Sequence, residues 1–340
     1  MTTIKISSQI RYWDQSPTRR IAPTDRNGRT IEVAYFHLAQ FTGYSKHYPL
    51  PLLYSYKNRK LFLPLREKFM SLDRATVYEA GDMFFEDELP EVQKTVDIPV
   101  FYFVYNMANY YHFIYDTLPY LYSYFNEKKI HPDMKLLVSP PEGQDDLYPF
   151  VWDSLNMLGI TRDDVVFLDP EVMYNRVCVS SSLTHNGLSN CPPHDGVFEI
   201  LNSLKSDYIG PEKIYISRRT WVHNKKDNIG TDYTERRRCV NEDQVAQIFK
   251  LYGFKEVFCE NLTMEEKIGM FRTAKYVAGP IGGGMCNLIF SPPETKVMSI
   301  NSPTFMDVNL RFAYSMVHTD LYNFEHTEFV DRQEESVESE

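Results

Sequence analysis

"NEDQVAQIFKLYGFKEVFCENLTMEEKIGMFRTAKYVAGPIGGGMCNLIFSPPETKVMSI", residues 241–300, alternates predicted helices and strands with short connections between them. We expect helices at 241–253 and 263–274, each followed by a short strand. Strands that alternate with helices of this length are typical of a parallel, Rossmann-like sheet, in which ligands bind at the carboxyl ends of the strands. The expected strands are 213–218, 255–260, 276–279 and 296–300.

The sequence before this segment predicts a second α/β half. Short β-like runs over residues 1–100 lead to a helix at 109–129, which we expect to be kinked near Pro119. The other expected elements are strands at 97–106, 134–141, 163–168 and 175–183 and helices at 147–160 and 196–208. Because 340 residues exceed the size at which a single core stops growing, two domains are the default.

The expected architecture is therefore α/β, with two Rossmann-like domains that face each other across a cleft. We place an N-terminal domain at 1–205 and a C-terminal domain at 206–325. The acidic tail at 326–340 is expected to be disordered.

The overall composition is that of an ordinary soluble globular protein, with 43% hydrophobic and 24% charged residues. The net charge of −10 argues against a general nucleic-acid binder. Neither a membrane span nor the apolar core of a signal peptide is evident. The five cysteines are scattered without a C-x-x-C pair, which predicts reduced thiols in the cytoplasm, or a luminal setting if this is an excised domain.

Three consecutive glycines, Gly282, Gly283 and Gly284, separate a strand from a short helix. Each glycine costs conformational entropy, so either the backbone turns sharply there or an anion approaches it closely. An anion would be received by free N–H groups and the positive helix end. The run is not a dinucleotide fingerprint, because Asn287 stands where a third small residue belongs, and no Gly-Lys-Ser/Thr follows as in a P-loop.

A strongly basic loop follows the strand at 213–218. Arginines at the carboxyl end of a strand can clamp a diphosphate through bidentate hydrogen bonds. A solvated basic loop is the alternative, but the glycine run two β/α units later favours a phosphate site. The basic residues of this region are Lys213, Arg218, Arg219, Lys225, Lys226, Arg236, Arg237 and Arg238.

The helix expected at 109–129 presents a candidate catalytic face. Four polar side chains share this face by their spacing, namely Asn109, His112, Asp116 and Tyr120. A carboxylate one turn from an imidazole can act as a general base with an orienting partner. The alternative is a His–Asp pair that serves only the helix surface or a domain junction.

Taken in order, four segments resemble glycosyltransferase family 61. They are "NYYHFIYDTLP" (109–119), "IYISRR" (214–219), "RRCVNE" (237–242) and "YGFKEVFCENLTMEEKIGMFRTAKYVAGPIGGGMCNLIFSPPETKV" (252–297). The resemblance is strong over 213–300 and faint before residue 100. This family includes plant xylan xylosyl- and arabinosyltransferases and animal O-linked N-acetylglucosaminyltransferases of the secretory pathway. One position departs from the family pattern Gly-Pro-His-Gly-Ala-Gly, because Ile281 stands at the histidine.

The resemblance implies a GT-B architecture, with an acceptor-binding domain at 1–205 and a nucleotide-sugar-binding domain at 206–325. It also implies a metal-independent transfer that inverts the anomeric centre. The implied donor is a nucleotide-diphosphate sugar, such as UDP-xylose, UDP-GlcNAc or UDP-arabinose, and the implied acceptor is a hydroxyl of a glycan. The sequence holds no Asp-x-Asp, so arginines and helix-end amides are expected to stabilise the leaving diphosphate. No cofactor is expected beyond this co-substrate.

Such a transfer requires that the leaving diphosphate is stabilised and that the acceptor hydroxyl loses its proton. These two requirements assign a role to each candidate residue. Asp116 is the expected base that activates the acceptor hydroxyl, and His112 is either its orienting partner or the base itself. Asn109 and Tyr120 are expected to contact the acceptor. Glu260 and Asn261 are expected to meet the base or ribose of the donor. The full expected donor-binding set is Arg218, Arg219, Arg237, Arg238, Glu260, Asn261, Gly282, Gly283, Gly284 and Asn287.

Two other function classes remain open at this stage. Ile281 favours a catalytically impaired glycan- or nucleotide-binding relative with the same fold, whereas the His112–Asp116 pair and the arginines favour an enzyme. A nicotinamide-dependent oxidoreductase requires a glycine fingerprint that this sequence matches poorly.

Overall fold

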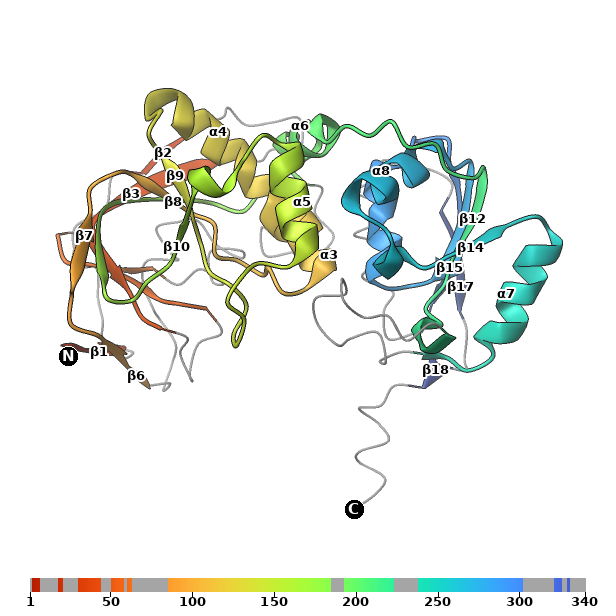
Figure 1. The fold of residues 1–340 in the computed structure, drawn as a ribbon, viewed down its shortest axis with the longest axis horizontal. Helices are drawn as coiled ribbons and strands as arrows, with labels where there is room; N and C mark the ends of the chain where they lie inside the picture. The colour runs from red at the N-terminus through yellow and green to blue at the C-terminus, as the bar shows by residue number, and fades with distance from the viewer. Residues whose placement is uncertain are drawn as a thin grey trace, which may run out of the picture.

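Two α/β halves lie side by side in the computed structural model, each built on its own sheet (Figure 1). The N-terminal sheet has nine strands and the C-terminal sheet has five. The structure describes residues 2–6, 18–20, 30–43, 50–57, 60–62, 85–184, 193–222, 238–301, 321–325 and 329–330.

The nine-stranded sheet is mixed. Its strands are β2 (Thr18–Arg20), β3 (Glu32–Phe41), β4 (Leu53–Ser55), β5 (Lys60–Phe62), β7 (Lys94–Val96), β8 (Val100–Tyr102), β9 (Lys135–Val138), β10 (Val165–Phe167) and β11 (Val172–Ser180). Neighbours are parallel along β10-β9-β8-β11 and antiparallel along β11-β3-β4-β5. The connections from β3 to β5 are too short for crossovers, so these strands pair antiparallel. The expected parallel pattern is thus confirmed for one side of this sheet and wrong for the other.

The helix that follows β8 is continuous but changes its geometry three times. Its parts are α3 (Tyr110–His112), the π-helical turn η1 (Phe113–Thr117), the 3₁₀ turn η2 (Leu118–Tyr120) and α4 (Leu121–Ile130). Pro119 has no N–H to donate, which interrupts the regular helix where a kink is expected. In the π-helical turn the N–H of Leu118 donates to the carbonyl of Phe113. This wider turn changes which side chains share a face further along the helix.

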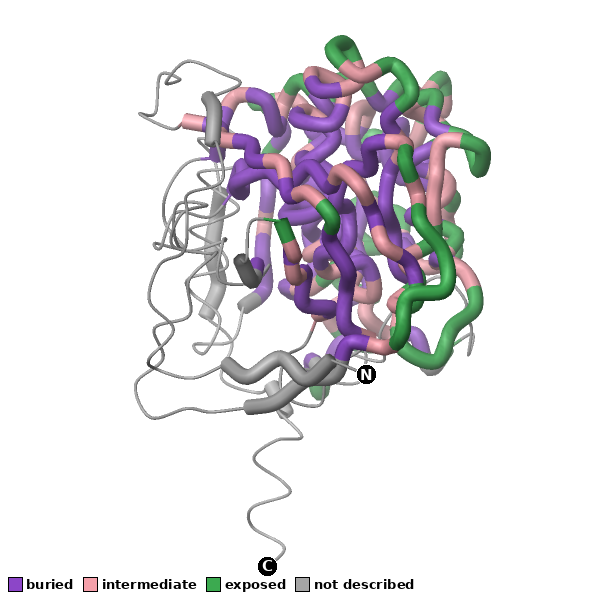
Figure 2. The backbone as a smooth tube through the Cα atoms, turned by 90° about the vertical axis from the view of Figure 1, so that its left-hand side faces the viewer, coloured by how far each residue is buried: buried purple, intermediate pink, exposed green. Residues whose placement is uncertain are grey.

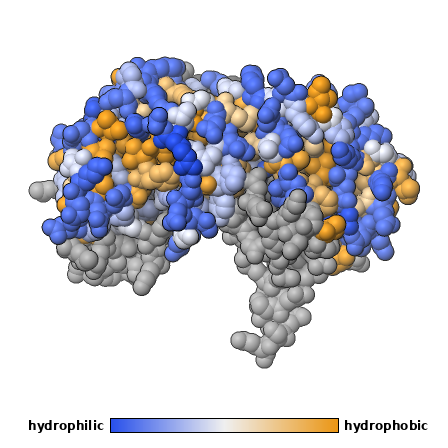
Figure 3. Space-filling view, in the orientation of Figure 1, coloured by the Kyte–Doolittle hydropathy of each residue, from blue (hydrophilic) through white to orange (hydrophobic). Residues whose placement is uncertain are grey.

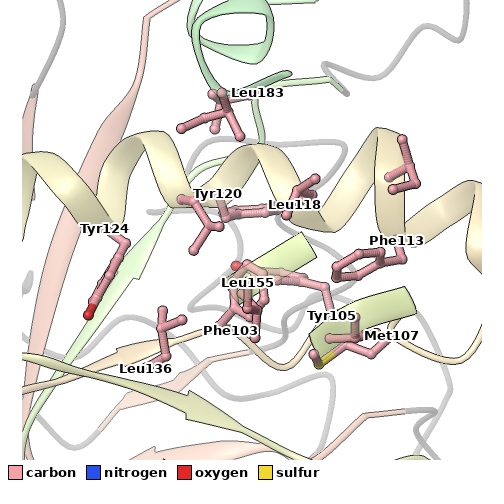
Figure 4. Close-up of a cluster of buried hydrophobic side chains, with 14 of the residues drawn as sticks. Phe103, Tyr105, Met107, Phe113, Leu118, Tyr120, Tyr124, Leu136, Leu155 and Leu183 are labelled. Atoms are coloured by element: carbon pink, nitrogen blue, oxygen red, sulfur yellow. The ribbon is translucent and has the colours of Figure 1, made fainter. Parts of the chain in front are cut away.

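Aromatic side chains fill the space between this helix and the sheet. Figure 4 shows Phe113, Leu118 and Tyr120 of the helix gathered with Phe103 and Tyr105, which follow β8. The rings of Tyr105 and Tyr120 are stacked with centroids 4.0 Å apart, and both residues are buried. The high aromatic content therefore serves the core here. The remaining helices of this half are α5 (Pro149–Met157), η3 (Arg162–Asp164) and α6 (Gly196–Ser203).

The five-stranded sheet of the C-terminal half is parallel throughout. Its strands are β12 (Lys213–Ile216), β14 (Lys255–Val257), β15 (Tyr276–Pro280), β16 (Lys296–Asn301) and β17 (Leu321–Glu325). Their order is β14-β12-β15-β16-β17, and every neighbouring pair is parallel. Numbered along the chain, this order is 2-1-3-4-5, the doubly wound arrangement that the sequence predicts. The direction of winding reverses between β12 and β15.

Helices cover both faces of this parallel sheet. They are η4 (Thr220–Val222), α7 (Glu242–Leu251), η6 (Cys259–Asn261), α8 (Met264–Thr273) and η7 (Gly283–Phe290). α7 and α8 lie on opposite sides of the strands (Figure 1). Tyr215 of β12 stacks on Phe249 of α7 with centroids 4.9 Å apart, whereas its neighbours Ile214 and Ile216 join the larger core. This alternation is why both faces of the sheet are apolar.

Two small antiparallel sheets complete the described strands. β1 (Thr2–Ile6) pairs with β6 (Phe85–Leu89), and β13 (Arg238–Cys239) pairs with β18 (Phe329–Val330). The second pairing makes the expected disorder of the tail wrong for residues 329 and 330, and the rest of 326–340 lies outside the described residues. The expected domain boundary at 205 falls in the connection between α6 and β12.

Buried backbone runs through the interior of both sheets, and exposed residues gather at turns and helix ends (Figure 2). The described cysteines are buried and form no disulfide with one another, and Cys191 lies outside the described residues. Within the part of the chain that the structure describes, no helix is long and apolar enough to cross a membrane.

The packing of α8 predicts the effect of one substitution. A Cβ at Gly269 would lie 2.3 Å from the backbone oxygen of Tyr208. We expect Gly269→Ala to lower the free energy of unfolding by about 1–3 kcal/mol, although alanine is the better helix former. Urea unfolding measures this change. Gly43→Ala is the control, because its new Cβ meets only Pro170 at 4.0 Å. Equal stability of the Gly269 variant and the wild type would contradict the packing.

Candidate functional site

The candidate site lies where the parallel sheet reverses its winding, between β12 and β15. Ligands of doubly wound sheets bind at such a point, outside the carboxyl ends of the strands. Arg218 follows the end of β12, and the glycine run Gly282–Gly284 follows the end of β15. Two segments more than sixty residues apart in the sequence therefore meet at one edge of the sheet.

Arg218 contacts the glycine run directly. Its Nη1 donates a hydrogen bond to the backbone oxygen of Ile281 at 2.5 Å. A Cβ at Gly282 would lie 2.6 Å from this same Nη1. The backbone of Gly282 is extended, with φ 163° and ψ −173°, which any residue can adopt. Glycine is therefore required at 282 for the close approach of the guanidinium and not for its dihedral angles.

The other two glycines have different surroundings. A Cβ at Gly284 would lie 2.8 Å from the side chain of Ile216, so this glycine allows the turn to pack on β12. A Cβ at Gly283 would meet nothing within 4 Å. The first bond of η7 joins the Met285 N–H to the Gly282 oxygen, so the amides of Gly283 and Gly284 precede the hydrogen-bonded turn. Within the described part of the chain these two amides have no hydrogen-bond acceptor, and such amides next to a guanidinium form an arrangement suited to an anion.

Ile281 does not point toward this edge. Its side chain belongs to the core and is 1% exposed. Its backbone is used twice, because the N–H donates to the Ile300 oxygen and the oxygen accepts from Arg218. Substitution of the family's histidine by isoleucine therefore leaves the backbone part of the site in place.

Glu242, at the start of α7, fixes the backbone of Arg218. Its Oε1 accepts from the Arg218 N–H at 2.7 Å, from Ser217 Oγ at 3.2 Å and from the Tyr215 hydroxyl at 3.3 Å. Oε2 is buried, and no described residue forms a hydrogen bond with it. Burial raises the pKa of Glu242, an effect that the Arg218 N–H partly opposes. Sequence reasoning missed this residue, although an acid directly after the basic run was a signal.

The guanidinium of Arg219 forms ion pairs with two carboxylates. Its Nε and Nη2 form a bidentate pair with Glu256 of β14 at 2.9 and 2.8 Å, and Nη1 contacts Asp243 of α7. These partners raise the pKa of Arg219 further above its ordinary value. The structure therefore corrects the expected role of Arg219, since its guanidinium holds α7 against the sheet edge instead of facing the glycine run.

The His112–Asp116 pair forms as predicted from the spacing. His112 Nδ1 and Asp116 Oδ2 are 2.6 Å apart, and Thr184 Oγ1 donates to Asp116 Oδ1 at 3.1 Å. The side chain of Asp116 is 0% exposed, whereas that of His112 is 37% exposed. The imidazole thus faces outward with the carboxylate behind it. Within the described part of the chain, His112 Nε2 has no hydrogen-bond partner.

The helix that bears this pair begins at the glycine run. α3 contacts η7, and the Tyr110 hydroxyl donates to Asn287 Oδ1 at 2.5 Å. Asn287 Nδ2 donates to the Gly284 oxygen at 2.9 Å, and Asn287 is fully buried. Asn287 therefore connects the two halves from behind the glycine run, which corrects the expected contact with the donor. The space-filling view shows the surface hollowed between the halves (Figure 3).

The remaining expected site residues fall into three groups. Asn109 caps α3 by accepting from the His112 N–H at 3.3 Å and is partly exposed. Tyr120 is fully buried against Tyr105, which corrects its expected contact with an acceptor. Two residues of η6, beyond the end of β14, remain accessible, namely Glu260 and Asn261.

The structure does not describe the side chains of two of the predicted arginines. Arg237 lies outside the described residues, and Arg238 is described only as part of β13. Among the side chains that the structure does describe, no group of three or more His, Cys, Asp or Glu is arranged to hold a metal ion.

A comparison with protein families identifies the chain. The sequence model described as Glycosyltransferase 61 matches residues 110–298, more than half of the chain. The chain belongs to glycosyltransferase family 61. Its matched range begins at α3 and ends in β16, so the His112–Asp116 pair, Arg218 and the glycine run all lie within it. Family 61 membership supports glycosyltransferase activity with a sugar donor and a glycan acceptor. No curated protein matches the chain.

The burial of Glu242 predicts how stability depends on pH. Its folded-state pKa is raised above that of the unfolded chain, so folding favours the protonated carboxyl. Its contribution to stability is present below the unfolded pKa, about 4.3, and is lost as pH rises through the folded pKa. Glu242→Gln cannot ionise. We expect the Tm of the wild type minus that of the variant to fall as the pH rises above about 4. Thermal unfolding at constant ionic strength measures it, and a constant difference would contradict the prediction.

Proposed function

We propose that this family 61 protein is an inverting, metal-independent enzyme that moves a sugar from a nucleotide diphosphate to a hydroxyl of a glycan. The proposal depends on one observation above all. A guanidinium and free amides meet at the reversal point of a doubly wound sheet, next to the helix that bears an outward-facing imidazole. Positive charge for a leaving group and a base for a nucleophile are the two requirements of glycosyl transfer.

The C-terminal half, 206–325, is the donor domain in this proposal. Arg218 and the amides of Gly283 and Gly284 stabilise the negative charge that grows on the departing diphosphate. They take the part that a divalent ion plays in other glycosyltransferases. Glu260 and Asn261, near the end of β14, contact the ribose or base. The resemblance to family 61 favours a UDP-sugar, with UDP-xylose and UDP-GlcNAc as the first donors to test.

The N-terminal half, 1–205, binds the acceptor across a GT-B cleft. We assign the base role to His112 and the orienting role to Asp116, because the imidazole faces outward and the carboxylate is buried with a second partner, Thr184. His112 Nε2 takes the proton of the acceptor hydroxyl. The hydroxyl oxygen then bonds to the anomeric carbon as the bond to the diphosphate oxygen breaks, with inversion. Asn109 caps the same turn and lines the acceptor side.

Ile281 supports a second candidate function, a catalytically impaired relative that binds nucleotide or glycan. An isoleucine side chain buried in the core donates no hydrogen bond to a substrate. One measurement distinguishes the two candidate functions. Release of UDP from a panel of UDP-sugars, with and without glycan acceptors, is expected for an enzyme. Binding of UDP without turnover of any donor would select the impaired relative.

Replacement of His112 tests the base assignment. We expect His112→Ala to lower kcat roughly 10²–10⁴-fold while the Kd for UDP, measured by calorimetry, stays within about twofold. Asp116→Asn is also expected to lower kcat, because the imidazole loses the acceptor that holds its orientation. Full activity of His112→Ala together with an inactive Asp116→Asn would return the base role to Asp116.

Replacement of Arg218 tests the diphosphate site. A hydrogen bond to a charged group contributes about 1.5–3 kcal/mol, so Arg218→Ala should raise the Kd for UDP by roughly 10- to 100-fold. Gly282→Ala keeps the guanidinium but displaces it, and should weaken binding in the same direction. Arg162→Ala is the control, because Arg162 pairs with Asp146 on the exposed surface. An unchanged Kd in both site variants would exclude this location.

A further inference from the structure

Tyr110 lies where described elements of the two halves contact each other. Contacts between the halves join α3 to η7, α5 to α8 and α6 to η7. Tyr110 is the first residue of α3 and is 8% exposed. It belongs to the helix of the His112–Asp116 pair, while its hydroxyl bonds to an element of the other half. The position of the Tyr110 side chain therefore affects the distance between the His112–Asp116 pair and the glycine run.

Two hydrogen bonds in series lead from Tyr110 to the glycine run. The Tyr110 hydroxyl donates to Asn287 Oδ1 at 2.5 Å, and Asn287 Nδ2 donates to the Gly284 oxygen at 2.9 Å. The amide of Asn287 thus has one partner from each half. Because both residues are buried, loss of either bond leaves a polar group without water to replace its partner. We call this series the Tyr110–Asn287 link.

The ring of Tyr110 is held from several sides. Lys267 Nζ of α8 lies 4.3 Å from the ring centroid, and the ring of Phe150 of α5 packs edge-on at 5.3 Å. Met264 Sδ lies 3.4 Å from the Tyr110 hydroxyl. These neighbours come from both halves, so the ring cannot move without disturbing each of them.

Lys267 adds a reason why the ring stays in place. It is 2% exposed, and no described residue forms a hydrogen bond or an ion pair with its ammonium. Burial lowers the pKa of Lys267. The face of the Tyr110 ring is the stabilising contact for this cation, and cation–π interactions are strongest when they are desolvated. Tyr110→Phe keeps the ring and removes only the hydroxyl, so it isolates the link from the packing.

We propose that Tyr110 is a positioning residue, which through Asn287 sets the distance between His112 and the amides of the glycine run. The inference rests on the proposed function, because it concerns the approach of the acceptor base to the donor diphosphate. His112 is two residues from Tyr110 within the same helical turn, and Gly284 is the residue that Asn287 holds. A displacement of about 1 Å between reacting groups can lower the rate on the order of 10²-fold.

The test compares Tyr110→Phe with Tyr124→Phe. Tyr124 is also fully buried, and its hydroxyl bonds to Met134 and Lys128 within the N-terminal half only. We expect Tyr110→Phe to lower kcat roughly 10- to 100-fold, while the Kd for UDP changes less than about twofold. Tyr124→Phe should keep the wild-type kcat. Equal kcat for Tyr110→Phe and the wild type overturns the proposal.

A double-mutant cycle tests whether the two residues act as one unit. Asn287→Ala, which frees the glycine run directly, should weaken UDP binding as well as lower kcat. The double variant Tyr110→Phe/Asn287→Ala should lose no more activity than Asn287→Ala alone, because the second change removes a bond that is already absent. Fully additive losses overturn the link.

Hydrogen exchange separates failure of this inference from failure of the proposed function. The amides of 283–288 should exchange faster in Tyr110→Phe than in the wild type, and no faster in Tyr124→Phe. If the wild type releases UDP from no donor, the proposed function fails and the exchange data alone decide the link. Unchanged exchange over 283–288 in Tyr110→Phe overturns it.

Discussion

The contact between the Arg218 guanidinium and the backbone of Ile281 and Gly282 joins the ends of β12 and β15. It requires a residue without a side chain at 282, and it requires the backbone of Arg218 to be held still. Glu242 meets the second requirement with a buried oxygen that accepts three hydrogen bonds. The positive edge of the sheet is thus preorganised before any ligand binds, which is the condition under which charges stabilise a leaving group most.

Three buried or partly buried ionisable groups of the C-terminal half are each compensated differently. Glu242 receives neutral donors and the backbone of Arg218, so its carboxyl is hydrogen-bonded without a full counter-charge. Arg219 has two carboxylates, Glu256 and Asp243. Lys267 lies over the π face of Tyr110, and no described residue forms an ion pair with it. Removing a charge from water is expensive unless partners replace the water, so each of these arrangements restricts the positions that its backbone can take.

The same contact explains how isoleucine can stand at position 281, where the family pattern has histidine. The backbone oxygen of residue 281 accepts from Arg218, and a backbone oxygen is present whatever the side chain. The isoleucine side chain packs into the core instead of facing the sheet edge. The contact between Arg218 and the backbone of residue 281 therefore does not depend on the side chain at this position.

The β/α alternation of residues 213–300 was enough to predict the parallel sheet, because period and element length are local properties. The spacing of His112 and Asp116 likewise predicted their contact, since both lie within one turn. The sequence did not show which polar side chains are buried or which remote residues contact them. Asn287 and Tyr120 look polar and available in the sequence, yet Asn287 is buried where the halves meet and Tyr120 is buried in the N-terminal core. Only the tertiary structure brought Thr184 to Asp116 and paired Arg219 with Glu256, because these contacts join residues that are remote along the chain. The same packing buried Asp116 and left the imidazole of His112 partly exposed.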